Sequence, residues 1–281
     1  MSDAIFRLPF RYDLRLTTGM RWLRQLGMNT RASWRSFFYV LAFAVSVVVA
    51  ALRPAHWRST VRNVLARQIL FTGYQATRFI SVVALLVGIS VVVQVQVWTA
   101  ALGQKALLGP ILVMVIIREL GPLLTSFIVI ARSGTAMATE LASMRVLGET
   151  HVLDGQGIDP FIYLILPRAV GAAISVFCLT VIFIGVSILA GFFSGLLLGA
   201  NTGTPWQFFQ SVFGAIRPAD VFNVIAKTWL PGLLMGCICC IEGLSIRGMA
   251  TEVPQAASRA VVKSIMAMFL ASAFVSILTY L

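Results

Sequence analysis

Long apolar runs separated by short polar segments set the pattern of the chain. A helix that crosses the hydrocarbon core of a membrane needs about 20 mostly apolar residues, and five runs are of that order or longer. Such runs predict an all-α polytopic membrane protein. The predicted spans cover residues 80–98, 107–130, 161–200, 221–246 and 261–281.

The third run is longer than one crossing needs, so it leaves the topology open. It could cross once, tilted or kinked, or twice with a turn near Gly185. Cytoplasmic loops carry an excess of Lys and Arg, and a single crossing puts every basic loop on the side of the basic N-terminus. The residues concerned are Arg132, Arg145, Arg168, Arg247, Arg259 and Lys263. The sequence therefore predicts five spans, a cytoplasmic N-terminus and a periplasmic C-terminus.

Three glycines in this run, Gly191, Gly195 and Gly199, repeat at intervals of four residues. Glycines at this spacing let a second membrane helix approach closely. Glycine is also common in membrane helices generally, so the pattern alone supports either interpretation.

Residues 1–75 form a predicted region of basic interfacial and elbow helices, ahead of a membrane domain over residues 76–281. Residues 1–35 are basic and amphipathic, which is typical of a segment lying on the membrane surface. Residues 37–52 are apolar but short for a span, and we expect a helix embedded obliquely in the cytoplasmic leaflet. The basic face of residues 57–75 predicts an elbow helix leading into the first span.

Composition and charge agree with a membrane protein and exclude other classes. Apolar residues make up 59% of the chain and charged residues 11%, whereas soluble proteins average about 25% charged residues. The net charge of +12 could suggest a nucleic-acid partner, but no zinc-ligand spacing or stacking-aromatic motif accompanies it. Beside apolar runs, Arg-rich stretches instead indicate the cytoplasmic face and its anionic headgroups. We therefore expect no nucleic-acid partner.

Two adjacent charged residues, Arg118 and Glu119, lie in the middle of the second span. A charge at the centre of a bilayer costs at least about 2.5–3.5 kcal/mol, so each should meet another helix, a polar ligand or water. Pro122 removes a backbone hydrogen bond and is expected to bend the helix just beyond them. The pair either serves function, as charges inside membranes commonly do, or belongs to an ion-pair network that only fixes helix packing.

Asp220 and Lys227 lie at the start of the fourth span, seven residues apart. This separation is about two helical turns, so both side chains share one face. Lys227 is expected near the outer interface, where its ammonium could meet a phosphate or simply extend to the interface.

The polar segment over residues 132–159 lies between the second and third spans. It predicts a compact helical segment on the cytoplasmic side, suited to docking a soluble partner, although an ordinary structured loop would look similar. The sequence has no phosphate-binding loop and no metalloprotease or nucleophile motif. His56 and His151 are far apart, so we expect no metal site. Energy for any transport must then come from a partner or an ion gradient.

Several ordered motifs resemble the MlaE/YrbE permease family of ABC transporters that work with MCE proteins. They are RELGP at Arg118 to Pro122, ARSG at Ala131 to Gly134, GIDP at Gly157 to Pro160, YLILPR at Tyr163 to Arg168 and AASRAVVKS at Ala256 to Ser264. Glu140, Met144-Arg145, Glu149, Asp220 and Lys227-Thr228 fit the same pattern, and the resemblance covers roughly residues 60–281.

The resemblance implies a non-catalytic permease of five spans in the bacterial inner membrane, working as a dimer. ATP and Mg²⁺ would be bound by separate ATPase subunits, and a ring of MCE domains would stand on the periplasmic side. A STAS-domain protein often regulates such an ATPase. The substrate implied is phospholipid, moved between the inner membrane and the MCE channel to maintain outer-membrane lipid asymmetry.

The resemblance also implies roles for particular residues. Arg118, Glu119, Lys227 and Asp220 would line the lipid site. A second set would couple to the ATPase, namely Glu140, Arg145, Glu149, Gly157, Asp159 and Pro160. The alternative function is an ion-gradient-driven secondary transporter of a hydrophobic substrate, with Glu119 as a proton relay.

Overall fold

The computed structural model describes residues 38–103, 107–197, 205–246 and 248–280. The chain divides into two units, Met1–Ala42 and Phe43–Leu281, and all contacts below lie within the second. The predicted surface segment 1–35 falls outside the described residues. The described residues are mostly helical and contain no strand, so the prediction of an all-α protein is confirmed.

Five helices in the described part of the chain are long and apolar enough to cross a membrane, as predicted. They cover Ser59–Thr99, Leu108–Val146, Phe161–Leu196, Pro218–Leu244 and Ala250–Thr279. A shorter apolar helix covers Phe38–Ala51.

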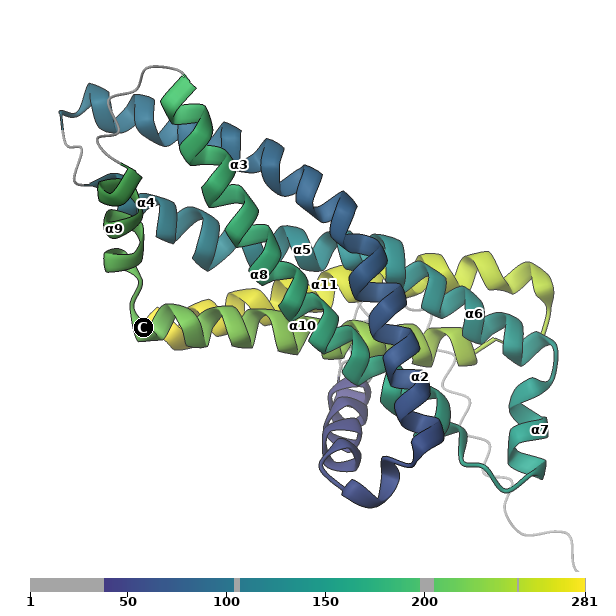
Figure 1. Ribbon diagram of the computed structural model, residues 1–281. Coiled ribbons are helices and arrows are strands. Elements are labelled where there is room, and N and C mark those ends of the chain that lie inside the picture. Colours follow the sequence, from purple (N-terminus) through teal and green to yellow (C-terminus); the bar gives the residue numbers. More distant parts are fainter. Residues whose placement is uncertain (1–37, 104–106, 198–204, 247, 281) are drawn as a thin grey trace, which may run out of the picture. The chain divides into compact units, whose positions relative to one another are not determined.

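Several of the long helices are composed of shorter elements (Figure 1). The first is α2 (Ser59–Ile69) and α3 (Gln75–Ala101), joined by a π-helical turn at Leu70–Tyr74. The second is α4 (Leu108–Leu112), α5 (Gly121–Val129) and α6 (Thr135–Val146), joined by π-helical segments at Val113–Leu120 and Ile130–Gly134. The others are α8 (Leu166–Leu197), α10 (Pro218–Leu244) and α11 (Val253–Tyr280), and a π-helical turn at Phe161–Ile165 leads into α8. Two short helices, α7 (Glu149–Gly155) and α9 (Pro205–Ala215), connect them.

Helix α2 lies where the elbow helix was expected and leads through its π-helical turn into α3. The predicted boundary differs from the structure at the second helix. The second helix does not end at residue 130 but runs to Val146. The small and apolar residues of α6 allow this extension, since Met137, Ala138 and Leu141 are buried where α6 packs against α10 and α11.

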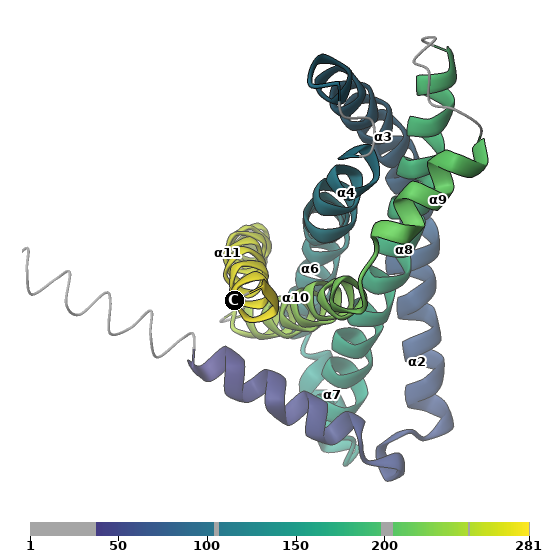
Figure 2. The ribbon, with the colours of Figure 1, turned by 90° about the vertical axis from the view of Figure 1, so that its left-hand side faces the viewer.

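The third span crosses once and has no turn at Gly185. Helices α3 and α8 lie side by side (Figures 1 and 2). A Cβ atom on Gly191 or Gly195 would overlap the side chain of Val92 or Gln96 on α3, and one on Gly88 would overlap the backbone of Ser187. The prediction that glycines permit a close helix contact is therefore confirmed for Gly191 and Gly195, and Gly199 lies outside the described residues.

Helix α10 occupies the centre of the helix packing and positions the candidate site. It packs against α6, α8 and α11 and runs beside α11 in both views (Figures 1 and 2). Its first turn lies at the end of the bundle that carries α9 and the C-terminus of α11, whereas α7 lies at the opposite end (Figure 1). Charged residues near the start of α10 therefore lie far from α7.

Candidate functional site

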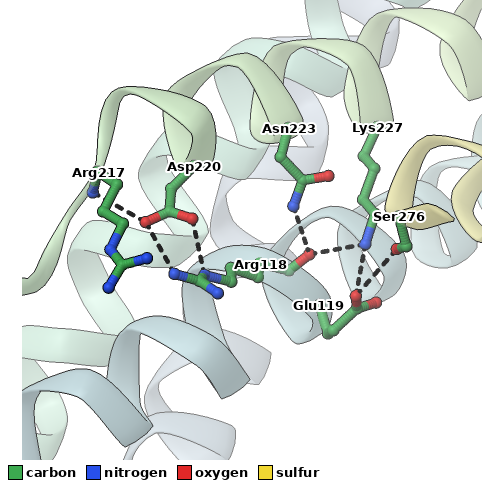
Figure 3. A network of polar contacts seen from close by, with 7 residues as sticks. All are labelled: Arg118, Glu119, Arg217, Asp220, Asn223, Lys227 and Ser276. Carbon is green, nitrogen blue, oxygen red and sulfur yellow. Dashed lines mark hydrogen bonds and ion pairs between the residues drawn. The ribbon is translucent and has the colours of Figure 1, made fainter. Parts of the chain in front are cut away.

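Arg118 and Asp220 form a two-pronged ion pair between the second helix and the first turn of α10 (Figure 3). Arg118 Nε lies 2.7 Å from Asp220 Oδ1, and Nη2 donates to Oδ2 at 3.2 Å. Asp220 Oδ2 also accepts the backbone N–H of Arg217 at 2.9 Å, which caps α10. The Asp220 carboxylate is fully buried, so it is committed to holding Arg118 and the start of α10.

Lys227 and Glu119 form the second ion pair, two turns further along α10 (Figure 3). Lys227 Nζ donates to Glu119 Oε1 at 2.6 Å, and Ser276 of α11 donates to the same oxygen at 3.2 Å. The Lys227 side chain is fully buried, whereas 44% of the Glu119 side chain is exposed. This pair joins α10 and α11 to the second helix.

The backbone carbonyl of Arg118 is a further acceptor in this network. In an α-helix this carbonyl would accept the N–H of residue 122, but that residue is proline and has no N–H. Lys227 Nζ donates to the carbonyl at 3.0 Å and Asn223 Nδ2 at 3.4 Å. Pro122 thus leaves an acceptor inside the membrane domain that two side chains of α10 use.

The structure brings all four predicted lipid-site residues into one network, in which two cations balance two anions. The network is of the kind that the helix-packing interpretation expects, because each charge has a partner on another helix. It also leaves two ionic groups partly accessible, the Glu119 carboxylate and the Arg118 guanidinium, whose side chain is 22% exposed. Packing and ligand binding are therefore compatible here.

The predicted coupling residues lie near α7, at the other end of the bundle (Figure 1). Gly148 and Gly157 flank α7 with φ of 74° and 72°, a backbone conformation that favours glycine. Arg145 donates to Thr150 Oγ1 at 3.2 Å, and Asp159 accepts the N–H of Phe161 at 2.9 Å. These contacts fix both ends of the α7 segment.

Glu140 and Glu149 differ in their surroundings. Glu140 pairs with the buried Arg168 of α8 at 2.7 Å, while its own side chain stays 56% exposed. Glu149 lies in the first turn of α7, where an acidic side chain is favoured by the helix dipole. Pro160 directly precedes the π-helical turn that leads into α8.

One ionic cluster was not assigned from the sequence. Glu242, near the end of α10, lies 3.3 Å from Arg259 Nε and 2.5 Å from Lys263 Nζ of α11. The signal was the spacing of Arg259 and Lys263, four residues apart and therefore on one helical face. A lone acidic residue near the end of an apolar span indicates such a partner helix.

Comparison with known proteins identifies the family. The family described as Permease MlaE matches residues 65–278. The chain is 30% identical to the chloroplast protein TRIGALACTOSYLDIACYLGLYCEROL 1 of Arabidopsis thaliana over 85% of this chain and 66% of that relative. It is 30% identical to a probable ABC transporter permease protein of Synechocystis sp., over 78% of this chain and 82% of the relative.

A third relative carries a more specific name. The chain is 28% identical to the intermembrane phospholipid transport system permease protein MlaE of Haemophilus influenzae, over 64% of this chain and 72% of that protein. The family match covers most of the five membrane helices together with the network and α7. The chain therefore belongs to the MlaE permease family.

Proposed function

We propose that this chain is the membrane-spanning permease subunit of an ABC transporter in the bacterial inner membrane. It would move phospholipid between that membrane and a periplasmic channel of MCE domains, maintaining outer-membrane lipid asymmetry. The observation that carries the proposal is a balanced, partly accessible set of charges between apolar membrane helices. The phospholipid-transport name of the Haemophilus relative supports the substrate class.

The charge pattern of the network suits a zwitterionic headgroup. A phosphate would be drawn to the Arg118 guanidinium, since Arg matches phosphate oxygens with paired donors. A headgroup amine would be drawn to the exposed Glu119 carboxylate. The side chains of Asp220 and Lys227 are buried and would position Arg118 and Glu119. When a headgroup amine pairs with the Glu119 carboxylate, the Lys227 ammonium would become free to contact the phosphate.

Glu119→Gln tests this headgroup role because the amide keeps an acceptor for Lys227 and Ser276 but removes the charge. A hydrogen bond to a charged group contributes about 1.5–3 kcal/mol, so transport of a zwitterionic lipid should fall about tenfold or more. The measurement is ATP-dependent transfer of a fluorescent phospholipid by the reconstituted complex. Ser276→Ala removes only one neutral donor to the same oxygen and should change transfer little. Unchanged transfer in Glu119→Gln would exclude Glu119 from headgroup binding.

The energy would come from ATPase subunits docked at the α7 end. The names of the ABC permease relatives support such a partner, and favour ATP over the gradient-driven alternative. Two exposed apolar side chains lie here, Leu147 two residues before α7 and Val152 within α7, beside the acidic Glu149. We expect α7 to seat in the ATPase, with the N-terminus of the chain cytoplasmic and its C-terminus periplasmic. A second permease copy, and in some systems a STAS-domain regulator of the ATPase, would complete the complex.

Val152→Asp should weaken this docking. Its side chain is exposed, so the substitution should leave the permease fold intact, while a charge placed in an apolar interface must be desolvated. We expect the ATPase to be lost when the complex is purified through the permease. Gln210→Asp, an exposed position on α9, adds the same charge at the opposite end of the bundle from α7 (Figure 1) and should retain the ATPase. Equal retention in both variants would mean that α7 is not the docking element.

A further inference from the structure

An apolar groove of about 550 Å³ runs along the side of α10. One wall is α10 from Phe222 to Leu233, another is α8, and Leu52 and Trp57 belong to a third part of the lining, around the turn before α2. All of the residues that line it are apolar or tryptophan. The groove therefore offers an aliphatic ligand a complementary surface and offers a polar ligand very little.

The groove is separate from the ionic network, although both use α10. Ala226 and Trp229 line the groove, whereas Asn223 and Lys227 point to the second helix (Figure 3). The two sets of residues lie on different faces of the helix. A ligand in the groove would therefore not displace the Lys227–Glu119 pair.

The length of the groove fits a lipid chain. From Phe222 to Leu233, α10 rises about 16 Å at 1.5 Å per residue. Trp229 is 44% exposed and sits in the middle of this stretch, in a helix apolar enough to span a membrane. In a bilayer, the molecules that surround such a helix are lipids, so a lipid acyl chain is the ligand that can reach the groove directly.

Positive charge lies beside Leu52 and Trp57 in the lining of the groove. Arg53 directly follows Leu52 and Arg58 directly follows Trp57, and both arginines are exposed. The turn that carries them is held by hydrogen bonds, since Trp57 Nε1 donates to the Ala51 carbonyl at 2.7 Å and His56 Nδ1 contacts the Ala50 carbonyl at 3.1 Å. This turn lies on the same side of the bundle as α7 (Figure 1). Trp and Arg together are typical of the membrane–water interface.

We propose that the groove binds one chain of an anionic phospholipid, whose headgroup is held by Arg53 and Arg58. The apolar walls accept the chain, and the two cations beside Leu52 and Trp57 select a negative headgroup over a zwitterionic one. The site is a second lipid site, distinct from the network of Arg118, Glu119, Asp220 and Lys227. It does not depend on whether the protein transports lipid.

Tryptophan fluorescence tests the proposal directly, because Trp57 and Trp229 both line the groove. The parent for this experiment is the full-length chain with Phe in place of Trp22, Trp34, Trp98 and Trp206, so that only Trp57 and Trp229 remain. Its thermal midpoint should match that of the native chain. It is reconstituted in phosphatidylcholine vesicles with a low fraction of brominated phosphatidylglycerol or brominated phosphatidylcholine. A basic residue near anionic lipid contributes about 1 kcal/mol, so we expect the anionic quencher to be favoured by roughly fivefold or more.

Three variants of this parent complete the experiment. Arg53→Gln with Arg58→Gln should abolish the preference, whereas Arg78→Gln, an exposed arginine on α3, should keep it. Ala226→Leu adds bulk to the groove wall and should reduce quenching by the anionic lipid. Equal quenching by the two lipids in the parent would overturn the proposal, as would a preference that survives loss of both arginines. Absence of quenching by either lipid would show that protein covers the groove, with a second copy as the first candidate, and would also overturn it.

Discussion

Lys227→Met is expected to destabilise the folded protein by about 1–3 kcal/mol, the usual cost of removing one partner from a buried hydrogen bond. The Lys227 ammonium is fully buried and serves two acceptors, Glu119 Oε1 at 2.6 Å and the Arg118 carbonyl at 3.0 Å. Methionine fills a similar volume but donates nothing. The carbonyl then loses the shorter of these side-chain bonds and keeps the longer one from Asn223, and Glu119 keeps the bond from Ser276.

Thermal unfolding in detergent, followed by circular dichroism, measures this effect. Lys263→Met is the matched control, because Lys263 also contacts a carboxylate, at 2.5 Å, but is 49% exposed and shares Glu242 with Arg259. Exposed pairs contribute about 0–1 kcal/mol, so the control should lose little. Adding Glu119→Gln to Lys227→Met should restore part of the stability, since the uncompensated charge is then gone. If both lysine variants unfold at the same temperature, the buried pair does not stabilise the fold as argued.

Much of the fold could be predicted because a membrane helix can be recognised in the sequence by its length and apolarity. The single crossing of the third span followed from the positions of the basic residues. Part of the candidate site could also be predicted, since a separation of seven residues put Asp220 and Lys227 on one face of α10, where both meet the second helix.

The way in which Arg118 and Glu119 both reach α10 could not be predicted from an ideal helix. Neighbours in an α-helix diverge by about 100°, which argues against a shared partner. Both residues lie in the π-helical segment Val113–Leu120, next to a proline that leaves the Arg118 carbonyl for Lys227. π-helical segments often occur at functional sites, and Pro122 was the local signal.

The end of the second helix could not be predicted, for a physical reason. A polar or small residue in sequence does not show whether it faces water or another helix. Residues 132–146 were expected in a polar segment after the second span, and α6 continues that helix through them because its small side chains pack against α10 and α11. A Cβ atom on Gly243 of α10 would lie 2.8 Å from the Ala138 carbonyl oxygen, which shows how close this contact is.

Helix α10 combines these features along its length. Charges near its first turns hold the second helix, glycines in its middle allow close contact with α8, and Glu242 near its end holds α11. A Cβ atom on Gly236 would lie 2.5 Å from the Ala169 Cα atom. Because the backbones are in contact, a movement of α6 or α8 at the α7 end would also displace α10. Such a displacement would connect the proposed ATPase to the ionic network.

Close backbone contact also makes Gly88→Ala the substitution with the second large expected effect. A methyl group at Gly88 would overlap the carbonyl group and Cα of Ser187 on α8, and these backbone atoms have no rotamer through which to yield. The hydrogen bond from Ser187 Oγ to the Ala84 carbonyl, 3.0 Å long, spans the same contact and would be strained. Overpacking typically costs about 1–3 kcal/mol, and more where backbone must move. We expect a lower thermal midpoint and a reduced yield of folded protein.

Gly185→Ala on α8 separates this clash from any general effect of alanine. A Cβ atom at Gly185 would meet nothing within 4 Å. Alanine is favoured over glycine in a helix interior by about 1 kcal/mol, so this variant should unfold at the same temperature or higher. The two substitutions are chemically identical and both lie in membrane helices, so their difference reports the α3–α8 contact alone. A thermal midpoint for Gly88→Ala equal to that of Gly185→Ala would mean that the two helices are not held at this separation.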